Sequence, residues 1–152
     1  MKRLSVLLAL VLMMSFCAMA LTVSDENVYP LADEVVELTV WTNNIADRDY
    51  WNCDMTKFIE QKMGIKINFD EFTGDSNTAY NLMLASDEWP DVFLGNWFST
   101  TQITDGVEAG MLLPLNDLIE AQGYNYKIML EENPGYKAML TAPDGNIYTF
   151  VY

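Results

Sequence analysis

The chain has 152 residues, of which 51% are hydrophobic and 20% charged, an ordinary composition for one globular domain. Its 22 acidic residues outnumber 8 basic ones, and the formal net charge of −14 excludes nucleic acid as a partner, because a polyphosphate needs a basic face. The absence of histidine counts against zinc enzymes and histidine-dependent triads, whereas carboxylate chemistry stays open. We expect no metal and no cofactor.

The first twenty residues have the three parts of a secretory signal peptide. Lys2 and Arg3 form a basic start, and residues 4–16 form an apolar run that is short for a membrane span. Ala18 and Ala20 then provide the small residues that a signal peptidase recognises. The alternative is a buried N-terminal helix. We expect export, with cleavage after Ala20 and an extracellular or periplasmic location.

Cys17 raises the alternative of a lipoprotein, in which this cysteine would be lipidated and would anchor the chain to a membrane. Phe16 precedes it and is bulkier than the small residue that lipoprotein processing needs, which favours cleavage after Ala20. If Cys17 is removed or lipidated, Cys53 is the one remaining thiol and no intramolecular disulfide can form.

The first half of the exported chain alternates strand patterns with helix patterns. Residues 21–34 are polar and are expected to form a linker. The β-formers of residues 35–41 predict a strand covered on both faces, followed by a polar loop over residues 42–48. The further predicted elements are a helix over 55–63 stopped by Gly64, a strand over 65–69, a helical stripe over 79–84 capped at Ser76 or Asn77, and a short buried strand over 91–95.

The second half contains mainly helical patterns. We expect a helix over 101–109 and an extended segment over 111–115. The next expected elements are a helix capped by Asn116 that runs to Gln122, helices over 127–132 and 136–140, a turn over 143–146 and a strand over 147–152 in which the chain stops. The order β-α-β-α-β predicts an α/β fold whose mainly parallel sheet is flanked by helices, with right-handed crossovers.

Several short motifs, in this order, resemble extracellular solute-binding proteins of bacterial ABC importers. The family resembled is the carbohydrate-associated one that includes alginate-oligosaccharide binders. The most specific stretch is WPDVF at 89–93, together with YNLMLAS at 80–86. The other matching segments are LTVW at 38–41, FIEQKMGIKI at 58–67, GMLLPLNDLI at 110–119, EENP at 131–134 and APDGNIY at 142–148.

This resemblance implies a periplasmic-binding-protein-like fold with two lobes that close on a ligand. It also implies that residues 35–152 form the N-terminal part of lobe 1 and that the second lobe is absent. The implied function is a monomeric receptor, not an enzyme, that captures a sugar or oligosaccharide and delivers it to an ABC transporter permease. Because half of the cleft would be missing, we expect this chain alone to bind sugar weakly.

In open α/β sheets, ligands bind beyond the carboxyl ends of the strands. The loop after the first predicted strand therefore supplies candidate ligand contacts: Trp41 as a flat apolar platform, and Asn43 and Asn44 as paired donors and acceptors for hydroxyl groups. The alternatives stay open, because Trp41 could equally belong to the core and both asparagines could simply shape the turn.

The loop after the third predicted strand supplies Asn96 and Trp97 by the same argument. Arg48 is the one arginine outside the signal peptide. It could bind the carboxylate of an acidic sugar in a bidentate manner, although an ion pair with Asp47 or Asp49 is the favoured interpretation.

Two other interpretations stay open. Asp87, Glu88 and Asp91 could serve a secreted carbohydrate-active hydrolase that uses paired carboxylates, or bind Ca²⁺, but no calcium-loop spacing is present and acids at helix ends are usually solvated. The other possibility is a non-functional fragment with no activity of its own.

Overall fold

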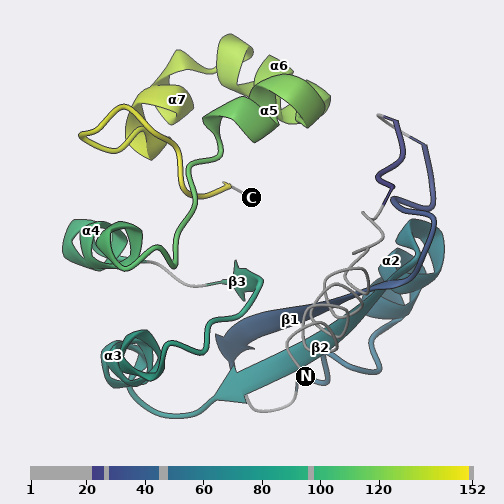
Figure 1. Ribbon diagram of the computed structural model, residues 1–152, viewed down its shortest axis with the longest axis horizontal. Helices are drawn as coiled ribbons and strands as arrows, with labels where there is room; N and C mark the ends of the chain where they lie inside the picture. The colour runs from purple at the N-terminus through teal and green to yellow at the C-terminus, as the bar shows by residue number, and fades with distance from the viewer. Residues whose placement is uncertain (1–21, 26–27, 45–47, 96–97, 151–152) are drawn as a thin grey trace, which may run out of the picture.

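The structure is a computed structural model that describes residues 22–25, 28–44, 48–95 and 98–150 (Figure 1). The predicted signal peptide, with Cys17, Ala18 and Ala20, therefore lies outside the described residues. The elements are β1 (Val36–Asn43), α2 (Asp54–Met63), β2 (Ile65–Phe72), α3 (Ser76–Ser86), β3 (Val92–Leu94), α4 (Thr100–Glu108), α5 (Asn116–Gln122), α6 (Tyr124–Glu132) and α7 (Pro134–Leu140).

The three strands form one parallel sheet in the order β2-β1-β3. Val36 pairs with Ile65 at the start of β1, and Asn43 pairs with Phe72 at its end. The shorter β3 pairs with the second half of β1, from Val40 opposite Val92 onward. The prediction of an α/β fold with a parallel sheet and helical crossovers is confirmed.

The ends of α2 and α3 show how local residues start and stop a helix. The Asp75 carboxylate accepts from the Thr78 amide at 2.8 Å and caps α3, so the predicted caps Ser76 and Asn77 are wrong by one or two residues. At the end of α2, Gly64 adopts the left-handed conformation (φ 68°) that favours glycine, as its position predicted.

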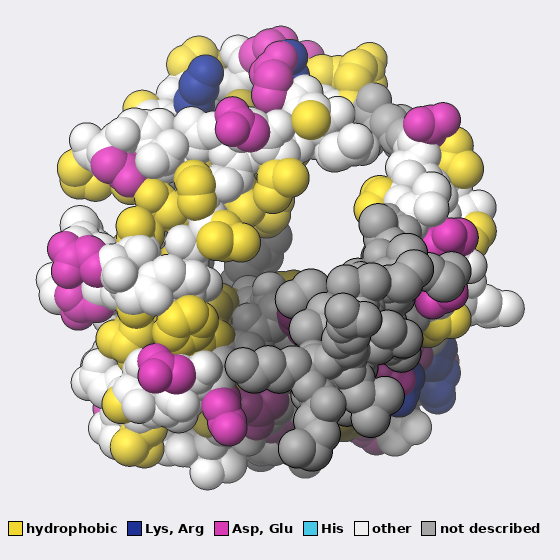
Figure 2. All heavy atoms as spheres, in the orientation of Figure 1, with side chains coloured by type: hydrophobic (Ala, Val, Ile, Leu, Met, Phe, Trp, Pro, Cys, Tyr) yellow, Lys and Arg dark blue, Asp and Glu magenta, His cyan; other side chains and the backbone are white. Residues whose placement is uncertain are grey.

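Two clusters of buried side chains hold the molecule together. The first lies between the sheet and α3 and is built on Trp41, Tyr80, Met83 and Met111. The second joins α5, α6 and the segment after α7 through Ile119, Leu130 and Ile147. Figure 2 shows apolar side chains gathered between α3 and α4 and along the inner side of the α5–α7 layer.

Two predictions for the second half are wrong. Residues 147–150 form no strand beyond an isolated bridge between Ile147 and Thr141, because Ile147 already pairs elsewhere. Its carbonyl accepts from the Leu115 amide at 2.8 Å, and its amide donates to the Asn116 side chain at 2.8 Å. Asn116 is therefore engaged across the fold and does not cap α5.

Part of the segment predicted as a linker is attached to the fold. The Ser24 amide donates to the Leu31 carbonyl at 2.8 Å, and the Leu31 amide donates to the Met63 carbonyl at 2.9 Å. Ala32 is buried. The described residues of this segment thus pack against the end of α2. Among the described helices, none is both long and apolar enough to cross a bilayer.

Candidate functional site

The carboxyl end of β1 places polar side chains at the edge where an α/β sheet offers its ligand site. Thr42 is buried and its hydroxyl donates to the Leu94 carbonyl of β3 at 3.1 Å, which ties the two strand ends together. Asn43 is exposed, and no described residue forms a hydrogen bond with its side chain.

Asn44 is also exposed but its groups are engaged. Its backbone amide donates to the Phe72 carbonyl at 2.8 Å, which extends the pairing of β1 with β2 by one residue. Its side-chain nitrogen donates to the Glu71 carboxylate. Asn44 thus fixes the path of the chain as it leaves the sheet, whereas among the described residues none engages the Asn43 side chain.

Trp41 does not form an exposed platform. It is 4% exposed, its ring stacks on Phe72 with centroids 4.1 Å apart, and its edge meets Phe93 at 5.8 Å. These contacts place it at the centre of the first cluster. The prediction of a ligand platform is wrong for this residue, because the indole is buried between the sheet and α3.

Arg48 is exposed and lies beside an aromatic group that the sequence reasoning missed. Its guanidinium donates to the Tyr50 hydroxyl at 3.5 Å, the Tyr50 ring stacks on Phe69 at 5.4 Å, and Trp51 meets Phe69 edge-on at 5.4 Å. Trp51 remains 48% exposed. Two consecutive aromatic residues directly after a polar loop were the signal that could have identified this group.

The expected ion pair between Arg48 and Asp49 is not present. The Asp49 carboxylate instead accepts from Asn52, at 3.1 Å from the backbone amide and 2.7 Å from the side chain. The Asn52 side chain, and then its backbone amide, hold the pKa of Asp49 below its usual value. Asp47, the other expected partner, lies outside the described residues, as do the predicted ligand residues Asn96 and Trp97.

Of the acids considered for catalysis, Asp91 has a structural role. Asp91 accepts from the Thr39 amide at 2.7 Å through its side chain and donates its own amide to the Thr39 carbonyl at 3.0 Å, which aligns β3 beside β1. Asp87 ends α3 in the left-handed conformation (φ 55°). Within the described residues, no group of three or more potential metal ligands is found.

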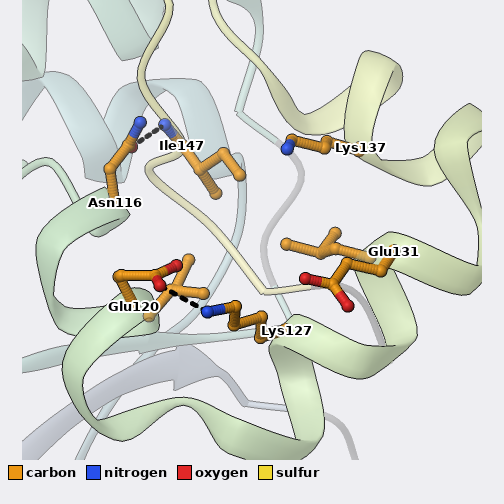
Figure 3. Close-up of a pocket in the computed structure, with 8 residues that line it drawn as sticks. Asn116, Glu120, Lys127, Glu131, Lys137 and Ile147 are labelled. Atoms are coloured by element: carbon orange, nitrogen blue, oxygen red, sulfur yellow. Dashed lines mark hydrogen bonds and ion pairs between the residues drawn. The ribbon is translucent and has the colours of Figure 1, made fainter.

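A separate hollow of about 190 Å³ lies among α5, α6, α7 and the segment that holds Ile147 (Figure 3). Its floor is formed by the buried aliphatic residues of the second cluster, and its rim carries charged groups. The Glu120 carboxylate accepts from the Lys127 amine, and this contact raises the pKa of Lys127. The lining residues are Asn116, Ile119, Glu120, Lys127, Leu130, Glu131, Lys137 and Ile147.

Comparisons with known proteins point to one group of binding proteins. No family model matches the sequence. The chain is 34% identical over 92 residues to the fructooligosaccharide ABC transporter substrate-binding protein FusA of Streptococcus pneumoniae, a match that covers 60% of this chain and 17% of FusA. The chain therefore spans less than a fifth of the length of this relative.

Solved structures agree with the sequence match. An EF-hand mutant of S. pneumoniae FusA in complex with fructo-nystose superposes with a TM-score of 0.68 at 28% identity, over 75% of this chain and 24% of that one. The alginate-binding protein AlgQ2 superposes with a TM-score of 0.67 at 28% identity, over 79% and 25% of the two chains. The predicted resemblance to carbohydrate-associated solute-binding proteins of ABC importers is confirmed, as is the periplasmic-binding-protein-like fold class.

Proposed function

We propose that this chain is part of an extracellular receptor that captures a sugar or oligosaccharide and delivers it to the permease of an ABC importer. The observation that carries the proposal is the 34% identity with FusA, which is named for fructooligosaccharides. The parallel sheet supports it by presenting an unengaged amide, Asn43, at the carboxyl end of its central strand. Sugar hydroxyls accept and donate, and an amide does both.

The proposed receptor is exported and has two lobes. Residues 35–152 contribute the N-terminal part of the first of two lobes, behind a signal peptide at residues 1–20 that exports the chain, with Cys17 as the alternative lipid anchor. The receptor acts as a monomer and binds without catalysis. The names of the similar proteins, which describe binding and not turnover, support the part of the proposal that concerns binding without catalysis.

Within the site, Asn43 contacts the ligand, and Glu71 acts through Asn44 as a positioning residue. Arg48 lies on the same loop and offers a second donor group beside Tyr50. Asn96 and Trp97 stay predicted contacts on the loop after β3. Trp41 is not included, because its ring is buried.

The test is a titration of the full chain with kestose, the sugar named for a FusA complex, followed by NMR of the side-chain amides. We expect millimolar kestose to shift the Asn43 amide and Asn43→Ala to weaken binding about tenfold, the effect of losing one ligand hydrogen bond. Asn81→Ala, an exposed asparagine on α3, is the matched control and should leave binding unchanged.

Two outcomes would contradict this proposal. Amide signals that stay fixed up to the solubility limit of kestose would refute sugar binding by this chain. Release of fructose from kestose, abolished by Asp91→Asn, would instead favour the hydrolase alternative.

A further inference from the structure

The hollow among α5, α6 and α7 lies in the second cluster, whereas the strand ends of the proposed sugar site lie in the sheet and contact the first cluster. Its floor consists of Ile119, Leu130 and Ile147, which are 5–7% exposed and leave an aliphatic surface beneath the opening. No aromatic ring is among the described residues that line it. The hollow therefore lacks the flat face on which a sugar ring stacks.

The rim carries two amines and two carboxylates, so its formal charges cancel. Glu120 and Lys127 satisfy each other through an ion pair at one side. Glu131 and Lys137 come from α6 and α7, and Figure 3 shows the Glu131 carboxylate and the Lys137 amine both directed into the open space. No ion pair joins these two groups, and among the described residues none forms a hydrogen bond with either side chain. The Glu131 carboxylate also attracts the Lys127 amine and adds to the rise in its pKa, but Lys127 forms its ion pair with Glu120.

The charges on the rim determine which kind of ligand the hollow can bind. A simple anion would meet the Glu131 and Glu120 carboxylates, and a simple cation would meet the Lys137 amine, so either charge alone is opposed by part of the rim. A molecule with both charges can satisfy Glu131 and Lys137 together, while an aliphatic body covers the floor. The volume of about 190 Å³ limits it to a small molecule.

We propose that this hollow binds a small aliphatic zwitterion of the α-amino-acid class, with its carboxylate on Lys137, its ammonium on Glu131 and its side chain on Ile119, Leu130 and Ile147. Asn116 is assigned a structural role here, since its side-chain oxygen accepts from the Ile147 amide at 2.8 Å and its side-chain nitrogen donates to the Gly145 carbonyl at 3.2 Å. It holds the wall of the hollow in place.

The test uses L-valine and two analogues that each lack one charge, titrated into the full chain with labelled methyl groups. Isovalerate lacks the ammonium and isobutylamine lacks the carboxylate. We expect valine to shift the Ile119, Leu130 and Ile147 methyl signals with a dissociation constant of about 1 mM, and each analogue to bind about tenfold more weakly. This arm needs no variant and so does not depend on whether a mutant folds.

Variants then assign each charge to its residue. Lys137→Met should weaken valine and isovalerate about tenfold but strengthen isobutylamine, because a repelling amine is removed. Glu131→Gln should weaken valine and isobutylamine about tenfold but strengthen isovalerate, because a repelling carboxylate is removed. Glu132→Gln and Lys57→Gln change the same residue types away from the hollow and should have no effect.

The proposal is overturned if the methyl signals do not respond to valine, or if isovalerate or kestose binds there as tightly as valine does. Because kestose is tested at the Asn43 amide and valine at the methyl groups of the second cluster, failure of one proposal leaves the other standing.

Discussion

The hydroxyl of Tyr80 forms a buried hydrogen bond whose contribution to stability can be tested. Tyr80 is fully buried, and its hydroxyl donates to the Gln102 carbonyl at 2.5 Å. Tyr80→Phe keeps the ring but leaves this carbonyl without its donor, so we expect the free energy of unfolding in urea to fall by about 1–3 kcal/mol. Tyr124→Phe, at a site that is 56% exposed, is the control and should change it by less than about 0.5 kcal/mol. Equal losses in the two variants would contradict the prediction.

The same hydroxyl makes stability depend on pH in the alkaline range. Burial, and then the charge of Asp105, raises the pKa of Tyr80. Folding thus favours the neutral phenol, and this contribution is complete below the pKa of an unfolded tyrosine, about 10. It is lost as the pH rises through the folded-state pKa. The stability difference between the wild type and Tyr80→Phe should therefore stay constant up to about pH 9 and shrink as the pH rises above about 10.

Single-residue roles at the sheet edge were only partly predictable. Topology correctly placed Asn43 and Asn44 at the carboxyl end of a strand. The sequence could not assign Trp41 to the core, because an indole at a strand end packs inward or outward according to which helix covers the sheet. Here that helix is α3, which brings Tyr80 and Met83. Nor could it distinguish the two asparagines, because the Glu71 that engages Asn44 lies 27 residues away.

At the scale of elements, the end of α2 depends on Gly64. Its φ of 68° strains any residue with a Cβ, and an added Cβ would stand 2.6 Å from the Cβ of Pro30. We expect Gly64→Ala to destabilise the chain by at least about 1–2 kcal/mol, the cost of the left-handed conformation alone. Gly135→Ala is the matched control in α7, where nothing lies within 4 Å of an added Cβ. It should be neutral or slightly stabilising by helix propensity. Thermal unfolding of both variants measures the difference, and a neutral Gly64→Ala would refute this role.

Elements with a strong local signal were predicted well, and those that depend on distant partners were not. The predicted helix over 55–63 and the observed Asp54–Met63 differ by one residue, because the apolar spacing and Gly64 are local signals. The strand expected over 147–152 failed for the opposite reason. A strand needs a partner along its length, whereas Ile147 pairs only briefly with Leu115, Asn116 and Thr141.

At the scale of the whole molecule, the order of strands and helices was sufficient to predict the parallel sheet, because right-handed crossovers leave few ways to connect it. The division of the core was not predictable. Apolar stripes show which face of a helix is buried but not which other element covers it. The result is a first cluster beside the sheet and a second, smaller one among α5, α6 and Ile147, with no buried residue in common.

This division predicts that the chain unfolds in two steps. The second cluster has three buried side chains, and so small a core contributes only a few kcal/mol. All four tryptophans precede residue 98, and Trp41 and Trp89 pack in or against the first cluster. Tryptophan fluorescence therefore reports the unfolding of the sheet and the first cluster. The Ile119 and Ile147 methyl signals report the unfolding of the second cluster. In urea we expect the methyl transition at a lower midpoint than the fluorescence transition. Coincident midpoints would show that the two clusters unfold as one cooperative unit and would contradict the prediction.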